Sequence, residues 1–195
     1  MNKPKNYDNT KTGGGDFQPV ELGAHRAIIK QVQETESKSG KPMIAVLIDF
    51  ASEDVQAGYV AEQYEQDTRP EKKWPFQAVQ YILAEDQDGN TNRSFKGFCT
   101  AFEDSNGTQI KWGDGAAWGS QFKGKRIGVV FGEVEEEYQG EIKTRRRIRW
   151  FCDDHKTQDQ QIPARKLYKG PRQAAPQTGG EEWMNVPFDN ETLPF

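Results

Sequence analysis

The chain has 195 residues, a net charge of −4 and two cysteines, and it holds no apolar run long enough to span a bilayer. Because no hydrophobic segment lies near the N-terminus either, we expect a cytoplasmic protein without a membrane partner and exclude exported, disulfide-stapled classes. A Gly-rich leader over residues 1–16 and a polar tail over residues 171–195 leave about 155 residues, the size of one domain over residues 17–170.

The first expected element is a β-hairpin. Residues 24–32 and 43–50 are apolar-rich runs, and the segment between them contains Gly40 and Pro42, which are typical turn residues. Lys38 and Lys41 lie in this turn, where they could hold phosphate groups. The alternative is an ordinary solvent-exposed basic turn.

The central part of the chain is harder to interpret. Residues 59–66 alternate in polarity, which favours a strand, and Trp74-Pro75-Phe76 could open either a strand or a short helix. We expect strands in this stretch. Trp74 is flanked by Lys72 and Lys73, so its ring is a candidate for stacking on a base.

A helix is predicted after residue 92. Asn92 can cap its N-terminus, and Asn106-Gly107 can end it. One face is apolar, since aromatic and thiol side chains fall at i, i+3, i+4 and i+7, namely Phe95, Phe98, Cys99 and Phe102.

The last elements form a second hairpin, over residues 126–132 and 142–151, with Tyr138-Gln-Gly-Glu141 as its turn. The element order therefore predicts a mainly β fold: a five-stranded OB-like barrel with one helix between the third and fourth strands. An SH3-like barrel or an irregular α+β sandwich would show similar alternation, and both stay open.

The strongest local chemistry lies on the last predicted strand. Because side chains alternate across a strand, one face should carry four basic side chains and an aromatic ring: Lys143, Arg145, Arg147, Arg149 and Phe151. Same-face neighbours stand about 6.8 Å apart, close to the phosphate spacing of a stretched single strand. Tyr138, in the adjoining turn, is a further stacking candidate. The alternative is that the arginines only pair with the acids at Glu133, Glu135, Glu136 and Glu137.

The tail is predicted to be a flexible acidic linker that presents a tip. Residues 170–180 are rich in Pro, Gly and Gln and contain no large apolar group. From Pro171 onward four acids oppose one arginine, a charge of −3, which leaves −1 for the rest of the chain. The tip combines acids with an apolar end, a pattern suited to a basic-rimmed apolar pocket on a partner: Asp189, Glu191, Leu193, Pro194 and Phe195. The alternative is a frayed terminus whose aromatic ring folds back on the domain.

Several ordered motifs resemble those of a phage family of OB-fold single-stranded DNA-binding proteins. The motifs are Phe95-Lys-Gly-Phe98, Glu103-Asp-Ser-Asn106, Gly124-Lys125 with Ile127-Gly128-Val129, and Glu136-Glu-Tyr138-x-Gly140-x-Ile142-Lys-Thr-Arg145. The tail is similar to the acidic tails of bacterial and phage single-stranded DNA-binding proteins. This resemblance implies a protein of the host cytoplasm that coats single-stranded DNA during phage replication or recombination, without sequence preference. It also implies that the tail recruits replication or recombination proteins.

The residues leave a second function and a second partner open. A non-enzymatic adaptor or inhibitor of a replication protein is the alternative, and a sliding clamp is the second candidate partner, because residues 190–195 are similar to a clamp-binding peptide. Residues 119–125 fit the start of a phosphate-binding loop, but Arg126 stands where Ser or Thr is needed. Cys152 and His155 have the spacing of half a zinc site only. We therefore expect no cofactor, no metal and no catalysis.

Overall fold

The structure is a computed structural model that describes residues 3, 5, 7, 18–113 and 118–170. The predicted tail over residues 171–195, with its docking tip, and most of the predicted leader lie outside the described residues.

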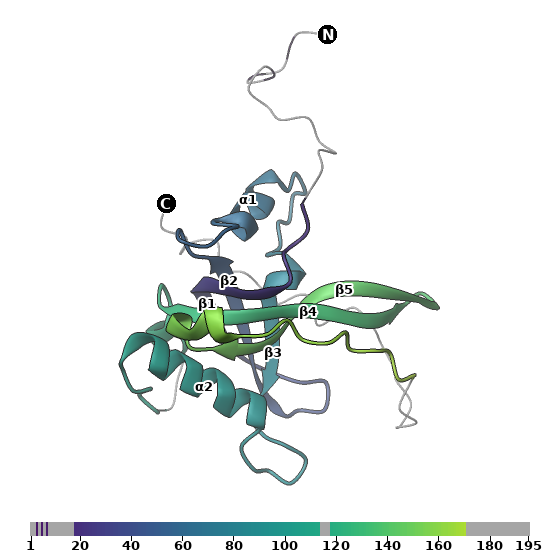
Figure 1. The fold of residues 1–195 in the computed structure, drawn as a ribbon. Helices are drawn as coiled ribbons and strands as arrows, with labels where there is room; N and C mark the ends of the chain where they lie inside the picture. The colour runs from purple at the N-terminus through teal and green to yellow at the C-terminus, as the bar shows by residue number, and fades with distance from the viewer. Residues whose placement is uncertain (1–2, 4, 6, 8–17, 114–117, 171–195) are drawn as a thin grey trace.

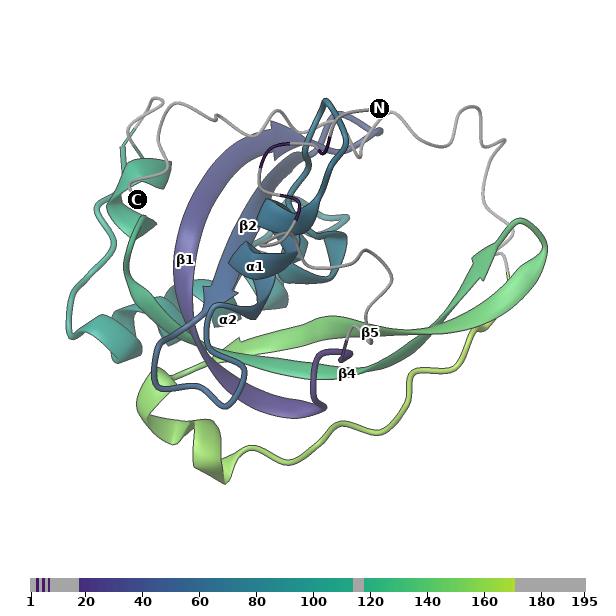
Figure 2. The same cartoon turned by 90° about the horizontal axis from the view of Figure 1, so that it is seen from above.

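Five strands form one antiparallel sheet, so the fold is mainly β as predicted. They are β1 (Gly23–Glu36), β2 (Pro42–Phe50), β3 (Val79–Leu83), β4 (Arg126–Tyr138) and β5 (Glu141–Cys152). The order across the sheet is β3-β2-β1-β4-β5, and β1 bends strongly around the body (Figures 1 and 2). Among the described residues no strand pairing joins β3 to β5, so the sheet is not closed by hydrogen bonds.

Both predicted hairpins are confirmed, and their strands are longer than the apolar runs that indicated them. β1 pairs with β2 from Ala27 opposite Phe50 to Glu36 opposite Pro42. The β4–β5 turn places Gln139 at φ 54° and Gly140 at φ 80°. Two consecutive positive φ angles are what a two-residue hairpin turn needs to match the twist of its strands.

The helix α2 (Arg93–Asn106) lies between β3 and β4, as predicted. The Asn92 side chain accepts a hydrogen bond from Ser94 N at 2.8 Å, and Gly107 ends the helix in a left-handed conformation. Its apolar face buries Phe98 and Phe102 against the sheet.

The expectation of a strand at residues 59–66 is wrong, since this segment is the helix α1 (Tyr59–Gln66). Val60 and Tyr64 are buried one helical turn apart. The buried Asp49 accepts hydrogen bonds through Oδ1 from the N–H groups of Val60 and Ala61, at 3.0 and 3.3 Å. These groups have no partner within the helix, so the carboxyl oxygen stabilises its first turn. The fold thus contains a second helix, between β2 and β3.

Three short 3₁₀ segments complete the described elements: η1 (Phe76–Ala78), η2 (Gly119–Phe122) and η3 (Asp154–Asp159). No helix among the described residues is long and apolar enough to cross a bilayer.

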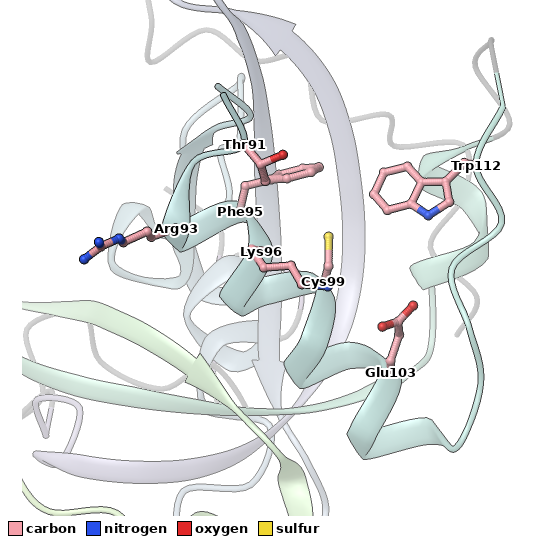
Figure 3. Close-up of a pocket in the computed structure, with 7 residues that line it drawn as sticks. All are labelled: Thr91, Arg93, Phe95, Lys96, Cys99, Glu103 and Trp112. Atoms are coloured by element: carbon pink, nitrogen blue, oxygen red, sulfur yellow. The ribbon is translucent and has the colours of Figure 1, made fainter. Parts of the chain in front are cut away.

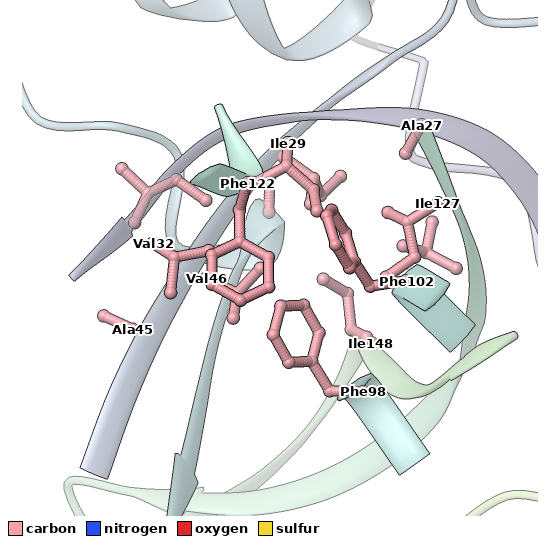
Figure 4. Packing of buried hydrophobic residues seen from close by; sticks show 14 of the residues in the cluster. Ala27, Ile29, Val32, Ala45, Val46, Phe98, Phe102, Phe122, Ile127 and Ile148 are labelled. Atoms are coloured by element: carbon pink, nitrogen blue, oxygen red, sulfur yellow. The ribbon is translucent and has the colours of Figure 1, made fainter. Parts of the chain in front are cut away.

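The core lies between the concave face of the sheet and α2. Large side chains from α2, from η2 and from three strands meet there (Figure 4), namely Phe98, Phe102, Phe122, Ile29, Ile127 and Ile148. The core therefore holds α2 and η2 against the strands from which the site projects.

His25 on β1 is buried at another part of the core. Its ring stacks on Phe50 at 4.5 Å between centroids, Nδ1 lies 2.9 Å from Asp54 Oδ1, and Nε2 lies 3.1 Å from the Glu21 carbonyl. Burial acts to lower the pKa of His25, but the hydrogen bond and charge of Asp54, with the Glu21 carbonyl, outweigh burial and raise it. Because both ring nitrogens face oxygen acceptors, the site favours the protonated ring.

Candidate nucleic-acid interface

The β4–β5 hairpin extends beyond the body of the sheet. β1 stops pairing with β4 at Gly23 opposite Phe131, whereas β4 and β5 remain paired as far as Tyr138 opposite Glu141. Residues 133–147, which we call the arm, therefore project as a two-stranded ribbon (Figure 2).

One face of the arm carries three of the predicted basic side chains. The strand register places Lys143, Arg145 and Arg147, here called the basic row, opposite Glu136, Val134 and Gly132. The Tyr138 ring belongs to the same face, with the Lys143 ammonium 5.4 Å and the Arg145 guanidinium 5.7 Å from its centre. The predicted alternation is confirmed for these three basic side chains.

The structure adds an aromatic residue that was not predicted for the site. Phe76 of η1 is 44% exposed, and the guanidinium carbon of Arg147 lies 4.4 Å from its ring centre. The basic row is thus bracketed by Tyr138 at one end and Phe76 at the other. The sequence offers only the apolar Trp74-Pro75-Phe76 cluster as a signal, and that cluster does not show which ring is exposed.

Acids on the same face neutralise part of the basic row. Arg147 donates from Nε and Nη2 to Glu136 at 2.9 and 2.8 Å, whereas Arg145 Nε is 3.7 Å from Glu136. Lys143 Nζ lies 3.1 Å from Glu141. The predicted pairing with the acid run is therefore confirmed for Glu136. The Lys143 and Arg145 side chains keep 43% and 42% of their surface exposed, and such exposed pairs are weak enough for a phosphate to compete.

The remaining acids of the run lie on the opposite face of the arm, covered by residues 165–168, which we call the strap. Arg165 pairs with Glu133 at 2.7 Å and with Glu135 at 3.9 Å, and the Tyr168 hydroxyl donates to Glu137. This hydrogen bond raises the pKa of Tyr168.

The strap also adds backbone hydrogen bonds. Glu135 N donates to Lys166 O at 2.8 Å, and Lys166 N donates to Glu133 O at 2.9 Å. Arg146 lies opposite Glu133 on this face and donates to the Val20 carbonyl. Glu133, Glu135 and Glu137 therefore lie on the other side of the ribbon from the basic row, where the strap pairs with them.

The predicted basic face ends before Arg149 and Phe151, so their assignment to it is wrong. Val130 pairs with Trp150 but Phe131 pairs with Ile148, which leaves Arg149 as an extra residue, a β-bulge. The Arg149 guanidinium donates to the Ala164 carbonyl at 3.0 Å. The Phe151 ring packs edge-on against Phe98 in the core, 5.2 Å away. The bulge breaks the strict alternation on which the prediction rested.

Trp74 is also not a stacking residue. It is 7% exposed, its indole N–H donates to the Ile48 carbonyl at 3.0 Å, and its ring lies 5.4 Å from that of Tyr64. Lys72 lies over the Tyr64 ring and donates to the Glu65 carbonyl. Lys73 is exposed. The buried indole therefore anchors the loop after α1.

Lys38 and Lys41 lie in the β1–β2 turn, at the opposite end of β1 from the arm. Lys41 donates from Nζ to the Asp86 carbonyl at 2.7 Å, which ties this turn to the loop before α2. The structure does not bring these lysines together with the basic row.

Metal-ligating and nucleophilic side chains are the ones that would bear on catalysis. The described residues contain no group of three or more His, Cys, Asp or Glu side chains placed to hold a metal ion. Burial raises the pKa of both thiols, Cys99 and Cys152, to about 11, so neither is a ready nucleophile.

No protein-family model matches the chain, and no curated protein matches it. The arm and the surfaces around it are therefore the features that bear on function.

Proposed function

We propose that the chain binds single-stranded DNA along the basic row of the arm, largely without sequence preference. The observation that carries this proposal is the row itself: three cations spaced about 6.8 Å apart on one strand face, bracketed by two exposed aromatic rings. Cations at this spacing suit successive phosphates of an extended strand. Exposed rings suit unpaired bases, which a duplex does not offer.

The arrangement of elements supports an OB-like barrel as the scaffold. The strand order and the position of α2 between β3 and β4 agree with that fold. The contact of Phe76 with Arg147 brings the segment before β3 against β5, across the gap in the sheet. In OB folds the loop between the last two strands contributes to ligand binding, and here the arm occupies that position.

The proposal includes a role for the tail. The tip would recruit a replication or recombination protein, with a sliding clamp as the second candidate. Its acidic and apolar residues are Asp189, Glu191, Leu193, Pro194 and Phe195. The setting would be phage DNA replication or recombination in the host cytoplasm, and the protein would act by coating the strand without chemistry or cofactor.

Binding is tested by fluorescence anisotropy with a labelled oligo(dT). The variant Lys143→Glu/Arg145→Glu reverses two exposed charges on the row, and we expect it to weaken binding by more than about tenfold at low salt. A matched control, Lys125→Glu/Lys156→Glu, makes the same charge change beyond the other ends of β4 and β5. If both variants lose affinity equally, the arm is not the binding face. If the wild-type chain does not bind oligo(dT) at all, the adaptor function replaces this proposal.

A further inference from the structure

A second surface, remote from the arm in sequence, has the features of a ligand site. A groove of about 640 Å³ lies beside α2, lined by Thr91, Arg93, Phe95, Lys96, Cys99, Glu103 and Trp112. Figure 3 shows Phe95, Cys99 and Trp112 turned toward one another from α2 and from the segment that follows it.

The floor of the groove is apolar and partly open to solvent. The Phe95 ring lies 6.3 Å from Trp112 and 6.3 Å from Trp118, and the two indoles are 5.9 Å apart. Trp112 is nevertheless 66% exposed. An indole that rests on other rings but leaves most of its surface in water would gain free energy by covering that surface with an apolar ligand group.

The two ends of the groove carry opposite charges. Arg93 and Lys96 are exposed on the first turn of α2, at the N-terminal end of the groove. Glu103 lies about two helical turns further on, where its Oε1 accepts a hydrogen bond from Ile110 N at 3.0 Å. A ligand with an apolar group and adjacent acids would place its acids toward Arg93 and Lys96.

We propose that this groove binds the tip of the chain's own tail, residues 187–195, with Leu193 and Phe195 covering Trp112. Asp189 and Glu191 would then face the cations at the N-terminal end of α2. The tail carries a net charge of −3, and its apolar groups match the floor of the groove. A stretched nucleic-acid strand fits less well, because Glu103 would repel a phosphate at the far end.

The tail is long enough for this contact. It comprises 25 residues after Gly170, with a fully extended reach of about 80 Å and a coil dimension of about 25 to 30 Å. A domain of about 155 residues measures about 40 Å across. Tethering raises the local concentration of the tip to the millimolar range, so even a weak contact would be occupied. This inference stands whether or not the chain binds DNA.

The test uses a labelled nonapeptide with the sequence of residues 187–195, titrated by fluorescence anisotropy with the full-length Phe195→Ala chain, whose own tip is disabled. We expect saturable binding. When Trp112→Ala or Lys96→Glu is introduced into the Phe195→Ala chain, the affinity for the peptide should fall by about tenfold or more. Arg145→Glu, on the arm, is the matched control and should leave peptide affinity unchanged. The wild-type chain should bind the peptide several-fold more weakly than Phe195→Ala, because its own tip competes.

Three results would overturn the inference. The first is no binding of the peptide by Phe195→Ala, and the second is binding that Arg145→Glu abolishes while Trp112→Ala does not. The third is a loss of oligo(dT) affinity in Trp112→Ala as large as the loss of peptide affinity, which would make the groove a nucleic-acid site. Because Trp112 and Lys96 are exposed, both variants should keep the wild-type circular dichroism spectrum, and Lys96→Glu tests the groove without removing a ring.

Discussion

Arg145 should behave as a phosphate contact, and Arg149 should not, although both lie on β5 and were expected on one face. The Arg145 side chain is 42% exposed and its closest acid, Glu136, is 3.7 Å away, so its guanidinium can turn to a phosphate. The Arg149 guanidinium instead donates to the Ala164 and Glu133 carbonyls. Each contact with a single strand adds about −0.7 to the slope of log affinity against log salt. Arg147 is only 16% exposed and pairs with Glu136 at 2.8 Å, so it is not counted as a contact. Two contacts, by Lys143 and Arg145, predict a slope of about −1.4, which Arg145→Ala should reduce to about −0.7.

The same relation sets the loss of affinity. One contact is worth about 0.7 log units at 0.1 M salt, so Arg145→Ala should weaken binding about fivefold there and less at higher salt. Tyr138→Ala removes a ring without a charge, and it should cost about 1 to 3 kcal/mol while preserving the slope. The assay is anisotropy of a labelled oligo(dT) over about 50 to 300 mM salt.

Arg149→Ala is the matched control for Arg145→Ala, since it removes the same side chain from the same strand. Its salt slope should equal that of the wild-type chain. An equal reduction of the slope in both variants would refute the reasoning, because it would mean that the bulge does not remove Arg149 from the binding face.

The other predictions concern stability, the strap and the tail. The pKa of His25 is raised above its ordinary 6.5, so the protonated ring stabilises the fold fully below about pH 6.5 and loses this contribution as pH rises through the raised pKa. Urea unfolding should show that decline, and Asp54→Ala should abolish it at a cost of about 3 to 5 kcal/mol. Arg165→Glu should weaken oligo(dT) binding by less than the Lys143→Glu/Arg145→Glu pair but measurably, since it releases Glu133 and adds an acid to the arm; unchanged affinity would show that the strap has no electrostatic role. Removing residues 189–195 should lower the unfolding midpoint slightly, because a tip bound in the groove stabilises only the folded state. It should keep or slightly raise DNA affinity and eliminate partners in a lysate pull-down, and identical partner sets would contradict a docking role.

Sequence patterns spanning a few residues correctly predicted the features that depend only on local backbone geometry. Asn92 and Gly107 cap α2 because a side-chain acceptor and a left-handed glycine satisfy groups in the adjacent turn. Gln139-Gly140 predicts the hairpin turn for the same kind of reason, since both residues must adopt positive φ. Alternation along a strand then places Lys143, Arg145 and Arg147 on one face without any knowledge of what packs on it.

Contacts between distant residues decided the rest. A bulge opposite Val130 and Phe131 turns Phe151 into the core, because burying its ring against Phe98 gains more than continued alternation. Arg165, 32 residues from Glu133 in the chain, pairs with the acids on the far face of the arm and neutralises part of their charge. The Trp74 indole is buried and donates to the Ile48 carbonyl, which leaves Phe76 as the exposed ring of the two. The sequence by itself determined which residues could bind phosphate, and only the tertiary structure decided which of them are presented together, because burial and pairing depend on segments far apart in the chain.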